Sequence, residues 1–255
     1  MIGDFGNRSN IERWAGRDMA LNGVETILTV GDNVYPYPQG LSDYDTHVGE
    51  FFGRWIRDRK FFPAIGNHDW DGPGESETFV RYFVVPRYYD FSVGQVHFYV
   101  LDSDGREPDG IEWRSKQADW FRQRIAENPG DCFRFVVFHH PAVSTKIDQT
   151  SFCGGCEPVP EMDWPFESFG IDGVFLGHAH WAERFFRRRI NFWTVGATTD
   201  DLDTIDFEVD ERSKFFVSRS GYLVIEPSLN RIDIGFRFVG SNSLEDVITI
   251  QKSCR

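Results

Sequence analysis

The sequence predicts an α/β fold, because short apolar runs alternate with amphipathic helical patterns over roughly the first 180 residues. Each run holds four to eight residues rich in β-branched and aromatic types, and each ends at a Gly, Asp, Asn or His. In α/β folds, ligands bind beyond the carboxyl ends of the strands. The polar residues that follow these runs are therefore the candidate site residues.

Five apolar runs predict the strands that deliver such residues, at positions 26–30, 61–65, 96–101, 133–138 and 173–176. Three amphipathic segments predict helices at 10–22, 45–58 and 112–128. After about Asn191 the pattern becomes mostly strand, with runs at 192–195, 215–217, 222–225 and 232–236. A turn at 227–230 separates the last two runs. We expect these later strands to form a second, more antiparallel sheet. No internal repeat or linker interrupts the chain, so we expect one domain over residues 1–255.

The composition of the 255 residues excludes several classes of protein. The abundance of Phe, at 25 residues, argues against a disordered chain. No apolar stretch reaches eighteen residues, so no segment is predicted to span a membrane. The net charge of -13 argues against broad electrostatic binding to nucleic acid or to anionic lipid. We therefore expect neither nucleic acid nor membrane as a partner; the oligomeric state stays open.

The cysteine content and the start of the chain bear on the cellular compartment. Four cysteines are too few for a disulfide framework at this length. Cys153 and Cys156 form a C-G-G-C run in a Ser/Thr/Pro/Gly-rich loop, where an incidental pair is favoured over a loop disulfide or a metal site. No signal-peptide pattern opens the sequence, which favours the cytoplasm; a secreted or periplasmic location is the alternative if the start is clipped. Met1 and Ile2 predict only a very short strand before Asp4.

The polar residues at the strand ends share a metal-binding chemistry. They are Asp4, Asp32, Asn67, His139 and the pair His178 and His180. Of the seven histidines, five lie at these ends, whereas His47 and His97 have no predicted role. Carboxylate, amide and imidazole ligands together suit Fe, Zn or Mn. Six or seven ligands exceed the needs of one tetrahedral zinc ion and predict two ions that share a bridging carboxylate, an arrangement suited to displacement at phosphorus.

Five short motifs resemble, in order, the conserved blocks of the calcineurin-like metallophosphoesterases. They are D-F-G at 4–6, G-D-N-V-Y at 31–35, G-N-H-D at 66–69, V-V-F-H at 136–139 and G-H-A-H at 177–180. More narrowly, they resemble the purple acid phosphatase branch, which includes the tartrate-resistant acid phosphatases. The resemblance implies a four-layer α/β/β/α sandwich, in which two mixed sheets are flanked by helices.

The resemblance also implies the role of each ligand. The first metal ion would be held by Asp4, Tyr35 and His180, and the second by Asn67, His139 and His178, with Asp32 bridging the two. His140 is the alternative to His139 as a ligand, and we expect it to support the ligands rather than to bind metal.

Tyr35 decides the branch and the expected metals. The Ser/Thr protein phosphatases carry an aspartate at this position, whereas a phenolate prefers Fe(III). The resemblance therefore implies Fe(III) together with divalent Fe, Zn or Mn. The alternative is that Tyr35 only packs within an aromatic loop with Pro36, Tyr37 and Pro38.

These features predict a dinuclear, metal-dependent, acid phosphatase-like enzyme that hydrolyses small phosphomonoesters by in-line attack of a metal-bound hydroxide. Asn67 and His68 would bind the substrate, and His68 would protonate the leaving group. The alternatives are a phosphodiesterase or nucleotide pyrophosphohydrolase that uses the same site, or a non-catalytic scaffold on this fold. One departure from the branch is that no His occurs between Pro141 and Gly177, where a further substrate-facing His is usual. The run at 187–189, three arginines, is expected to be a solvated turn between strands.

Overall fold

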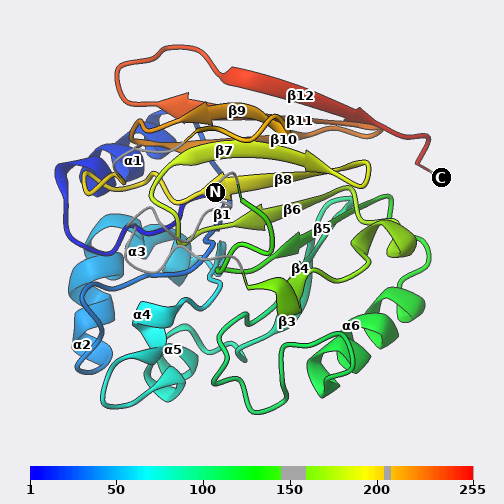
Figure 1. Cartoon of the computed structure of the whole chain (residues 1–255). Coiled ribbons are helices and arrows are strands. Elements are labelled where there is room, and N and C mark those ends of the chain that lie inside the picture. Colours follow the sequence, from blue (N-terminus) through cyan, green and yellow to red (C-terminus); the bar gives the residue numbers. More distant parts are fainter. Residues whose placement is uncertain (145–158, 204–207, 255) are drawn as a thin grey trace.

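A mixed seven-stranded sheet lies at the centre of the computed structural model, which describes residues 1–144, 159–203 and 208–254 (Figure 1). Neighbouring strands are parallel from β4 to β8, and antiparallel pairs close both edges of the sheet. In spatial order the strands are β3 (Tyr89–Val93), β4 (Val96–Val100), β5 (Phe133–Val137), β6 (Gly173–Leu176), β8 (Ile190–Val195), β7 (Ala182–Arg187) and β9 (Ser213–Val217).

A second strand layer is built from two small sheets that the first residues of the chain connect. The antiparallel sheet consists of β10 (Gly221–Pro227), β11 (Arg231–Phe238) and β12 (Glu245–Gln251), and the parallel one of β1 (Ile27–Leu28) and β2 (Phe61–Phe62). Met1 and Leu223 exchange backbone hydrogen bonds of 2.6 and 3.0 Å, and Ile2 forms a parallel bridge with Thr29. The short strand expected before Asp4 therefore lies between β10 and β1.

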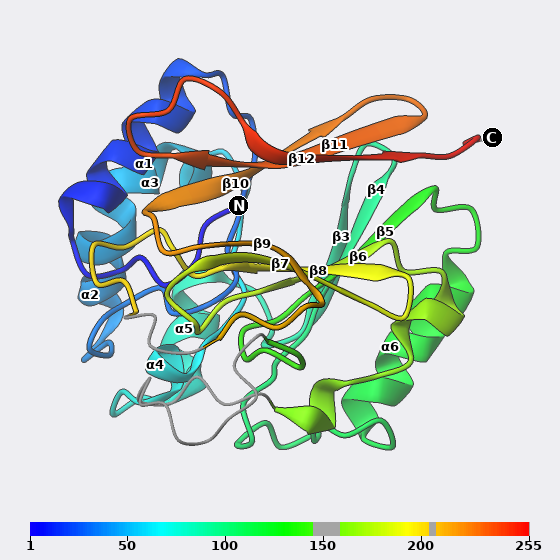
Figure 2. The same ribbon diagram turned by 45° about the horizontal axis from the view of Figure 1, so that its top comes forward.

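Helices cover the outer faces of the two strand layers, and a separate apolar core fills each interface (Figure 2). On β5 the side chains alternate: Phe135 and Val137 join the core between the sheets, whereas Val136 faces α6 (Lys116–Glu127). The second layer packs against α1 (Asn10–Leu21), α3 (Glu50–Arg57) and α5 (Ser76–Phe83). This arrangement confirms the predicted metallophosphoesterase fold with its four layers.

The remaining helical turns are short and lie mostly in connections. They are α2 (Leu41–Tyr44), the π-helical turn η1 (Asp45–Gly49), α4 (Asn67–Trp70), and the 3₁₀ turns η2 (Pro160–Met162) and η3 (Phe166–Phe169). None of the described helices has the length and apolar character needed to cross a membrane.

Several predicted elements differ from the observed ones for identifiable reasons. The helix expected at 112–128 begins only at Lys116, because the Ser115 hydroxyl caps it by accepting from the Ala118 N–H. The helix expected at 45–58 opens with the π-helical turn. The runs at 192–195 and 215–217 were expected in the second sheet, but they join the first one, since apolar pattern alone does not say which sheet a strand enters. The elements β3, β7, β12 and α5 were not predicted.

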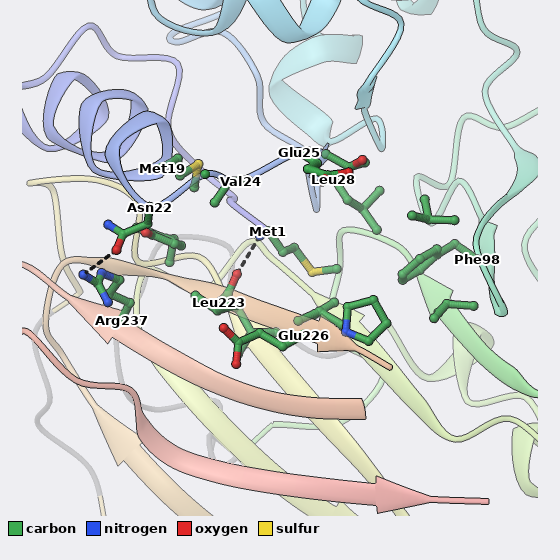
Figure 3. Close-up of a pocket in the computed structure, with 18 of the residues that line it drawn as sticks. Met1, Met19, Asn22, Val24, Glu25, Leu28, Phe98, Leu223, Glu226 and Arg237 are labelled. Atoms are coloured by element: carbon green, nitrogen blue, oxygen red, sulfur yellow. Dashed lines mark hydrogen bonds between the residues drawn. The ribbon is translucent and has the colours of Figure 1, made fainter. Parts of the chain in front are cut away.

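A cavity of about 500 Å³ lies between the segment at Met1, β4 and β10, and none of the predicted site residues lines it (Figure 3). Residues that precede or open strands contribute to it, including Thr26 just before β1 and Val96 at the start of β4. Many of its lining side chains are apolar, and Glu25, Glu226 and Arg237 are its charged members. The cavity is thus separate from the residues that follow the strands.

A disulfide joins Cys132, next to β5, to Cys254 near the end of the described chain. This pair was not predicted, because 122 residues separate the two cysteines and spacing in the sequence does not reveal connectivity. Lys252 adds contacts beside it, donating to the Cys132 carbonyl at 3.0 Å and to Asp172. The C-G-G-C run at 153–156 falls outside the described residues.

Replacing both bridged cysteines, as Cys132→Ser with Cys254→Ser, should lower the free energy of unfolding by about 2–5 kcal/mol, because the link restrains a long loop of the unfolded chain. Urea denaturation of the oxidised wild type and the double variant measures the difference, with the reduced wild type as a control. Alkylation of both thiols in the native, unreduced protein would contradict the pairing.

Candidate metal centre

All seven predicted ligands meet at the ends of the strands that deliver them. Asp4 follows the segment between β10 and β1, and Asp32 follows β1. Asn67 opens α4 just after β2, and His139 follows β5. His178 and His180 follow β6. Strands from both layers of the sandwich therefore contribute to one site, as expected for ligands placed beyond carboxyl ends.

The hydroxyl of Tyr35 lies at the centre of a first set of donor atoms. Its oxygen is 3.0 Å from Asp32 Oδ2, 3.3 Å from Asp4 Oδ1 and 3.2 Å from His180 Nε2. The side chains of Asp4 and Asp32 are almost wholly buried. The set that the resemblance assigned to the first metal ion is thus brought together.

A second set surrounds the Nε2 atom of His139. That atom is 3.0 Å from Asn67 Oδ1 and 3.2 Å from both His178 Nδ1 and Asp32 Oδ2. Asp32 is therefore within reach of both sets, which is the position required of a bridging carboxylate. Two ring nitrogens and an amide oxygen that face one another offer lone pairs to a common point, so this donor set fits a cation.

Backbone carbonyls orient two of the imidazole rings. His139 Nδ1 donates to the Val30 carbonyl at 2.8 Å, and His180 Nδ1 donates to the Asp201 carbonyl at 2.6 Å. Since a carbonyl oxygen can only accept, each Nδ1 carries a proton, which leaves Nε2 as the nitrogen that can bind a metal ion after any proton of its own is lost. Histidine ligands of metal ions are commonly held in this way. The tautomers are therefore those that metal binding through Nε2 requires.

Three of the seven residues adopt a left-handed backbone conformation. The φ angles are 56° at Asp4, 53° at Asp32 and 69° at His178. Non-glycine residues adopt such angles rarely, and strained positions of this kind concentrate at functional sites. Hydrogen bonds stabilise these turns: the His178 N–H donates to the Asp4 carboxylate at 3.0 Å, and the His68 N–H donates to Asp32 Oδ1 at 2.9 Å.

Gly66 allows the loop that bears Asn67 to approach the central carboxylate. A Cβ atom at this position would lie 2.2 Å from Asp32 Oδ1 and 2.4 Å from the Asp32 nitrogen, closer than any side chain permits. The glycine that opens the G-N-H-D motif is thus explained by the close approach of its backbone to Asp32.

The buried charges alter one another's pKa values. Burial raises the pKa of Asp4 to about 6. Burial also opposes ionisation of Asp32, but the charge and hydrogen bond of His139 hold the pKa of Asp32 below its usual range. For His139, burial is outweighed by Asp32, and the pKa is raised to about 10. Burial and both carboxylates raise the pKa of Tyr35 well above its usual value. Without a cation, the protonated ring of His139 therefore supplies positive charge beside the two carboxylates, whereas Tyr35 stays a neutral phenol.

His68 lies beside the ligands with one ring nitrogen available. Its Nδ1 donates to the Pro36 carbonyl at 2.5 Å, and its ring packs 4.4 Å from that of Tyr35, centroid to centroid. Its Nε2 is 3.9 Å from Asp32 Oδ2, and about a third of the side chain is exposed. The free nitrogen can therefore reach a molecule bound at the site.

His140 lies behind the second donor set, together with a residue that was not predicted. Ser103, which follows β4, accepts the His140 N–H at 2.8 Å and contacts its Nδ1 at 2.9 Å. The His140 ring is 4.6 Å from that of His178, and ring nitrogens of His139, His140 and His178 all lie within 4.8 Å of one another. Burial, together with the neighbouring His139 and His178, holds the pKa of His140 well below its usual value.

A buried network beneath Asp32 was also not assigned a role from the sequence. Asp69 accepts from the Asn33 amide at 2.9 Å, the Gly66 N–H at 2.9 Å and the Tyr44 hydroxyl at 2.8 Å. It therefore ties the G-D-N-V-Y loop to the G-N-H-D loop. Asn33 and Asp69 belong to those motifs, so the signal was present, whereas nothing in the sequence pointed to Tyr44 or to the Asp201 carbonyl.

The fold and the metal-binding donor set together define a metallophosphoesterase. The family model described as calcineurin-like phosphoesterase matches residues 1–182, and the chain belongs to this family. A search of curated protein sequences gave no significant match.

Two solved structures are similar over nearly the whole chain. One is GAP50, the anchor in the inner membrane complex of Plasmodium, with a TM-score of 0.78, 16% identity, and coverage of 99% of this chain and 87% of that one. The other is the purple acid phosphatase PPD1 from yellow lupin (Lupinus luteus) seeds, with a TM-score of 0.74, 15% identity and 98% coverage of this chain. The chain spans about half, 52%, of the lupin protein. At these identities the likeness shows the fold alone.

Metal binding by the metal-free protein should weaken as the pH falls from 7 to 5. The raised pKa of Asp4, about 6, means that this carboxyl must lose a proton to bind a cation below that pH, whereas above it the carboxylate is already free. Calorimetric titration with Zn(II) at both pH values, in buffers of different ionisation enthalpy, measures the affinity and the protons released. Equal affinities at pH 5 and pH 7 would show that Asp4 is not a ligand.

Proposed function

We propose that the protein is a phosphatase that uses two metal ions to hydrolyse small phosphomonoesters. The observation that carries the proposal is the convergence of seven donor side chains in two sets, with Asp32 within reach of both. The two-set arrangement supports two ions that share a carboxylate, which suits in-line displacement at phosphorus.

When bound, the two ions would supply Lewis acidity toward the phosphate oxygens and would lower the pKa of a bound water. The protein supplies the rest. Asp32 and Asp4 hold buried negative charge where the cations are needed. Asn67 presents its amide to the same point as His139 Nε2, and its amide N–H group would donate to a phosphate oxygen.

His68 is the proposed proton donor to the leaving group. The Pro36 carbonyl fixes the proton on Nδ1, so a second proton on Nε2 would make the ring a cation that can be neutralised by transfer to an alkoxide or phenoxide. The Nε2 atom lies 3.9 Å from Asp32 Oδ2, so it faces the centre of the site. The usual additional His of the purple acid phosphatase branch does not occur between Pro141 and Gly177, which leaves His68 this task.

The proposed metal pair is Fe(III) with a divalent Fe, Zn or Mn ion. Tyr35 supports this pair, because its hydroxyl contacts Asp4, Asp32 and His180 rather than apolar neighbours alone. A hard trivalent ion is the partner that would displace a proton from a phenol whose pKa is strongly raised. This placement favours the purple acid phosphatase-like assignment over simple packing in an aromatic loop.

Two other functions are distinguishable. A phosphodiesterase or nucleotide pyrophosphohydrolase would use the same ligands and differ in what binds around the phosphate. A non-catalytic scaffold is the other possibility, and the similarity to an anchor protein, GAP50, is the specific observation in its favour. The complete set of candidate ligands argues against a scaffold, because a non-catalytic protein on this fold has no need to retain metal ligands.

The proposed partner is a small phosphorylated molecule, with neither nucleic acid nor membrane as a partner. The net charge of -13 does not oppose an anionic substrate, because two bound ions would add about +4 to +5 at the site. The disulfide between Cys132 and Cys254 favours an oxidising compartment, secreted or periplasmic, over the cytoplasm that the first residues suggested.

Parallel assays with an aryl phosphate and a bis-aryl phosphate test the activity. We expect faster turnover of the monoester by the wild type, and a loss of both activity and metal content in Asp32→Ala, because that side chain serves both donor sets. A drop in rate of at least about 10³-fold is expected for loss of a catalytic metal site. Preference for the diester would support the second function, and a metal-free wild type without hydrolysis would support a scaffold.

Tyr35→Phe should remove the visible absorption band of the iron-loaded protein, because the phenolate is the only proposed source of charge transfer to Fe(III). Absorption spectra of wild type and variant, at equal iron content measured by elemental analysis, provide the comparison. A band that persists unchanged in the variant would remove Tyr35 from the ligand set.

A further inference from the structure

His47 has no role in the site as described so far, yet its ring is directed at one of the ligand-bearing loops. It lies in the π-helical turn η1, which interrupts an otherwise continuous helical segment from α2 to α3. Single π-helical turns within helices are rare and occur often near functional sites. The turn brings the His47 ring to the backbone of the loop that follows Asp4.

His47 Nδ1 donates a hydrogen bond of 2.6 Å to the carbonyl oxygen of Gly6. The same oxygen accepts a second hydrogen bond, of 2.8 Å, from the backbone N–H of Tyr35. Because a carbonyl only accepts, Nδ1 must carry the proton in this contact. A single acceptor thus links His47 to the backbone of the residue proposed as the Fe(III) ligand.

The two loops that carry Asp4 and Tyr35 are in direct backbone contact. The Asp4 N–H donates to the Gly31 carbonyl at 3.2 Å and the Phe5 N–H to the Asp32 carbonyl at 3.3 Å. At Gly6, a Cβ atom would lie only 1.8 Å from the Asn33 carbonyl oxygen. The contacts at Asp4, Phe5 and Gly6 therefore hold the two loops together. Gly6 is the last of these three residues, and its carbonyl accepts the hydrogen bond from the Tyr35 N–H.

The turn that bears His47 is itself anchored from two sides. Asp45 accepts from the Tyr82 hydroxyl at 2.9 Å, and Glu50, just after the turn, pairs with Arg8 at 3.2 Å. Arg8 belongs to the loop that follows Gly6. The neighbouring Thr46 differs, since its exposed hydroxyl bonds only to carbonyls of its own helix, those of Ser42 and Asp43.

We propose that His47 is a positioning residue: its hydrogen bond to Gly6 fixes the carbonyl that holds the Tyr35 backbone, and thereby sets the place of the Tyr35 phenol between Asp4, Asp32 and His180. The metal-related part of this inference rests on the proposed function. The link from His47 through Gly6 to Tyr35 belongs to the protein chain alone and can be measured without metal.

The first test is amide hydrogen exchange of the metal-free protein. His47→Leu should speed exchange of the Tyr35 amide by roughly tenfold, because its acceptor loses the second donor that holds it in place. His47→Asn, which places an N–H donor near the position of Nδ1, should restore slow exchange. Thr46→Ala, in the same helical turn, should leave the Tyr35 amide unchanged. Unchanged exchange in His47→Leu, or no rescue by asparagine, would overturn the inference; His47→Ala provides the same contrast if the leucine variant does not fold.

The second test is metal titration of the same four proteins with Co(II), followed by visible absorption. We expect the wild type to bind two ions. His47→Leu should lose about tenfold in affinity for one of them, and His47→Asn should recover it. A wild type that binds two ions equally well in all variants would overturn the positioning role and leave the proposed function intact. A wild type that binds no Co(II) would count against the proposed function, while the exchange result would still decide the link from His47 to Tyr35.

Discussion

The burial of two carboxylates beside one hydroxyl is the constraint on which the site depends. Asp4 and Asp32 both lie within 3.3 Å of the Tyr35 oxygen, and neither has appreciable contact with solvent. Two buried like charges so close together repel strongly unless protons or cations lie between them. Three features hold the two carboxylates together against this repulsion. They are the left-handed turns, the close backbone approach at Gly66 and the hydrogen bonds of Asp69. A cation is the natural counterpart of such an arrangement.

Much of the fold was predictable from the sequence because the strands that carry the site are short, buried and end at polar residues. The runs that became β4, β5 and β6 were placed within a residue or two of their observed limits. Strands without fully buried residues were not predicted: β3 is half-buried except at Ser92, and β12 mixes half-buried with exposed residues, so both give a weak apolar pattern. The sequence also did not predict which sheet β8 and β9 would join, because that depends on pairing with other strands.

The candidate ligands could be selected from the sequence for a related reason: a strand end is a local feature, and five such ends carried matching chemistry. The supporting contacts were less accessible. The roles of His47 and Ser103 arise from backbone or side-chain contacts 37 to 41 residues away in the chain. The disulfide between Cys132 and Cys254 likewise joins parts of the chain whose proximity only the folded structure reveals. Contacts of this range follow from tertiary packing and leave no periodic signal in the sequence.

The short segment before Asp4 has a consequence for the order in which the protein assembles. Met1 pairs with Leu223 across 222 positions, and Ile2 pairs with Thr29, so the segment acquires its second neighbour only once β10 has been synthesised and has docked. Contacts between residues this distant in sequence form slowly, because closing a long loop is entropically costly. A ribosome-bound chain that ends before β10 would therefore hold every candidate ligand, but the segment before Asp4 would be paired on one side only, with Thr29. Final ordering of the Asp4 end of the site would accordingly be a late event in folding.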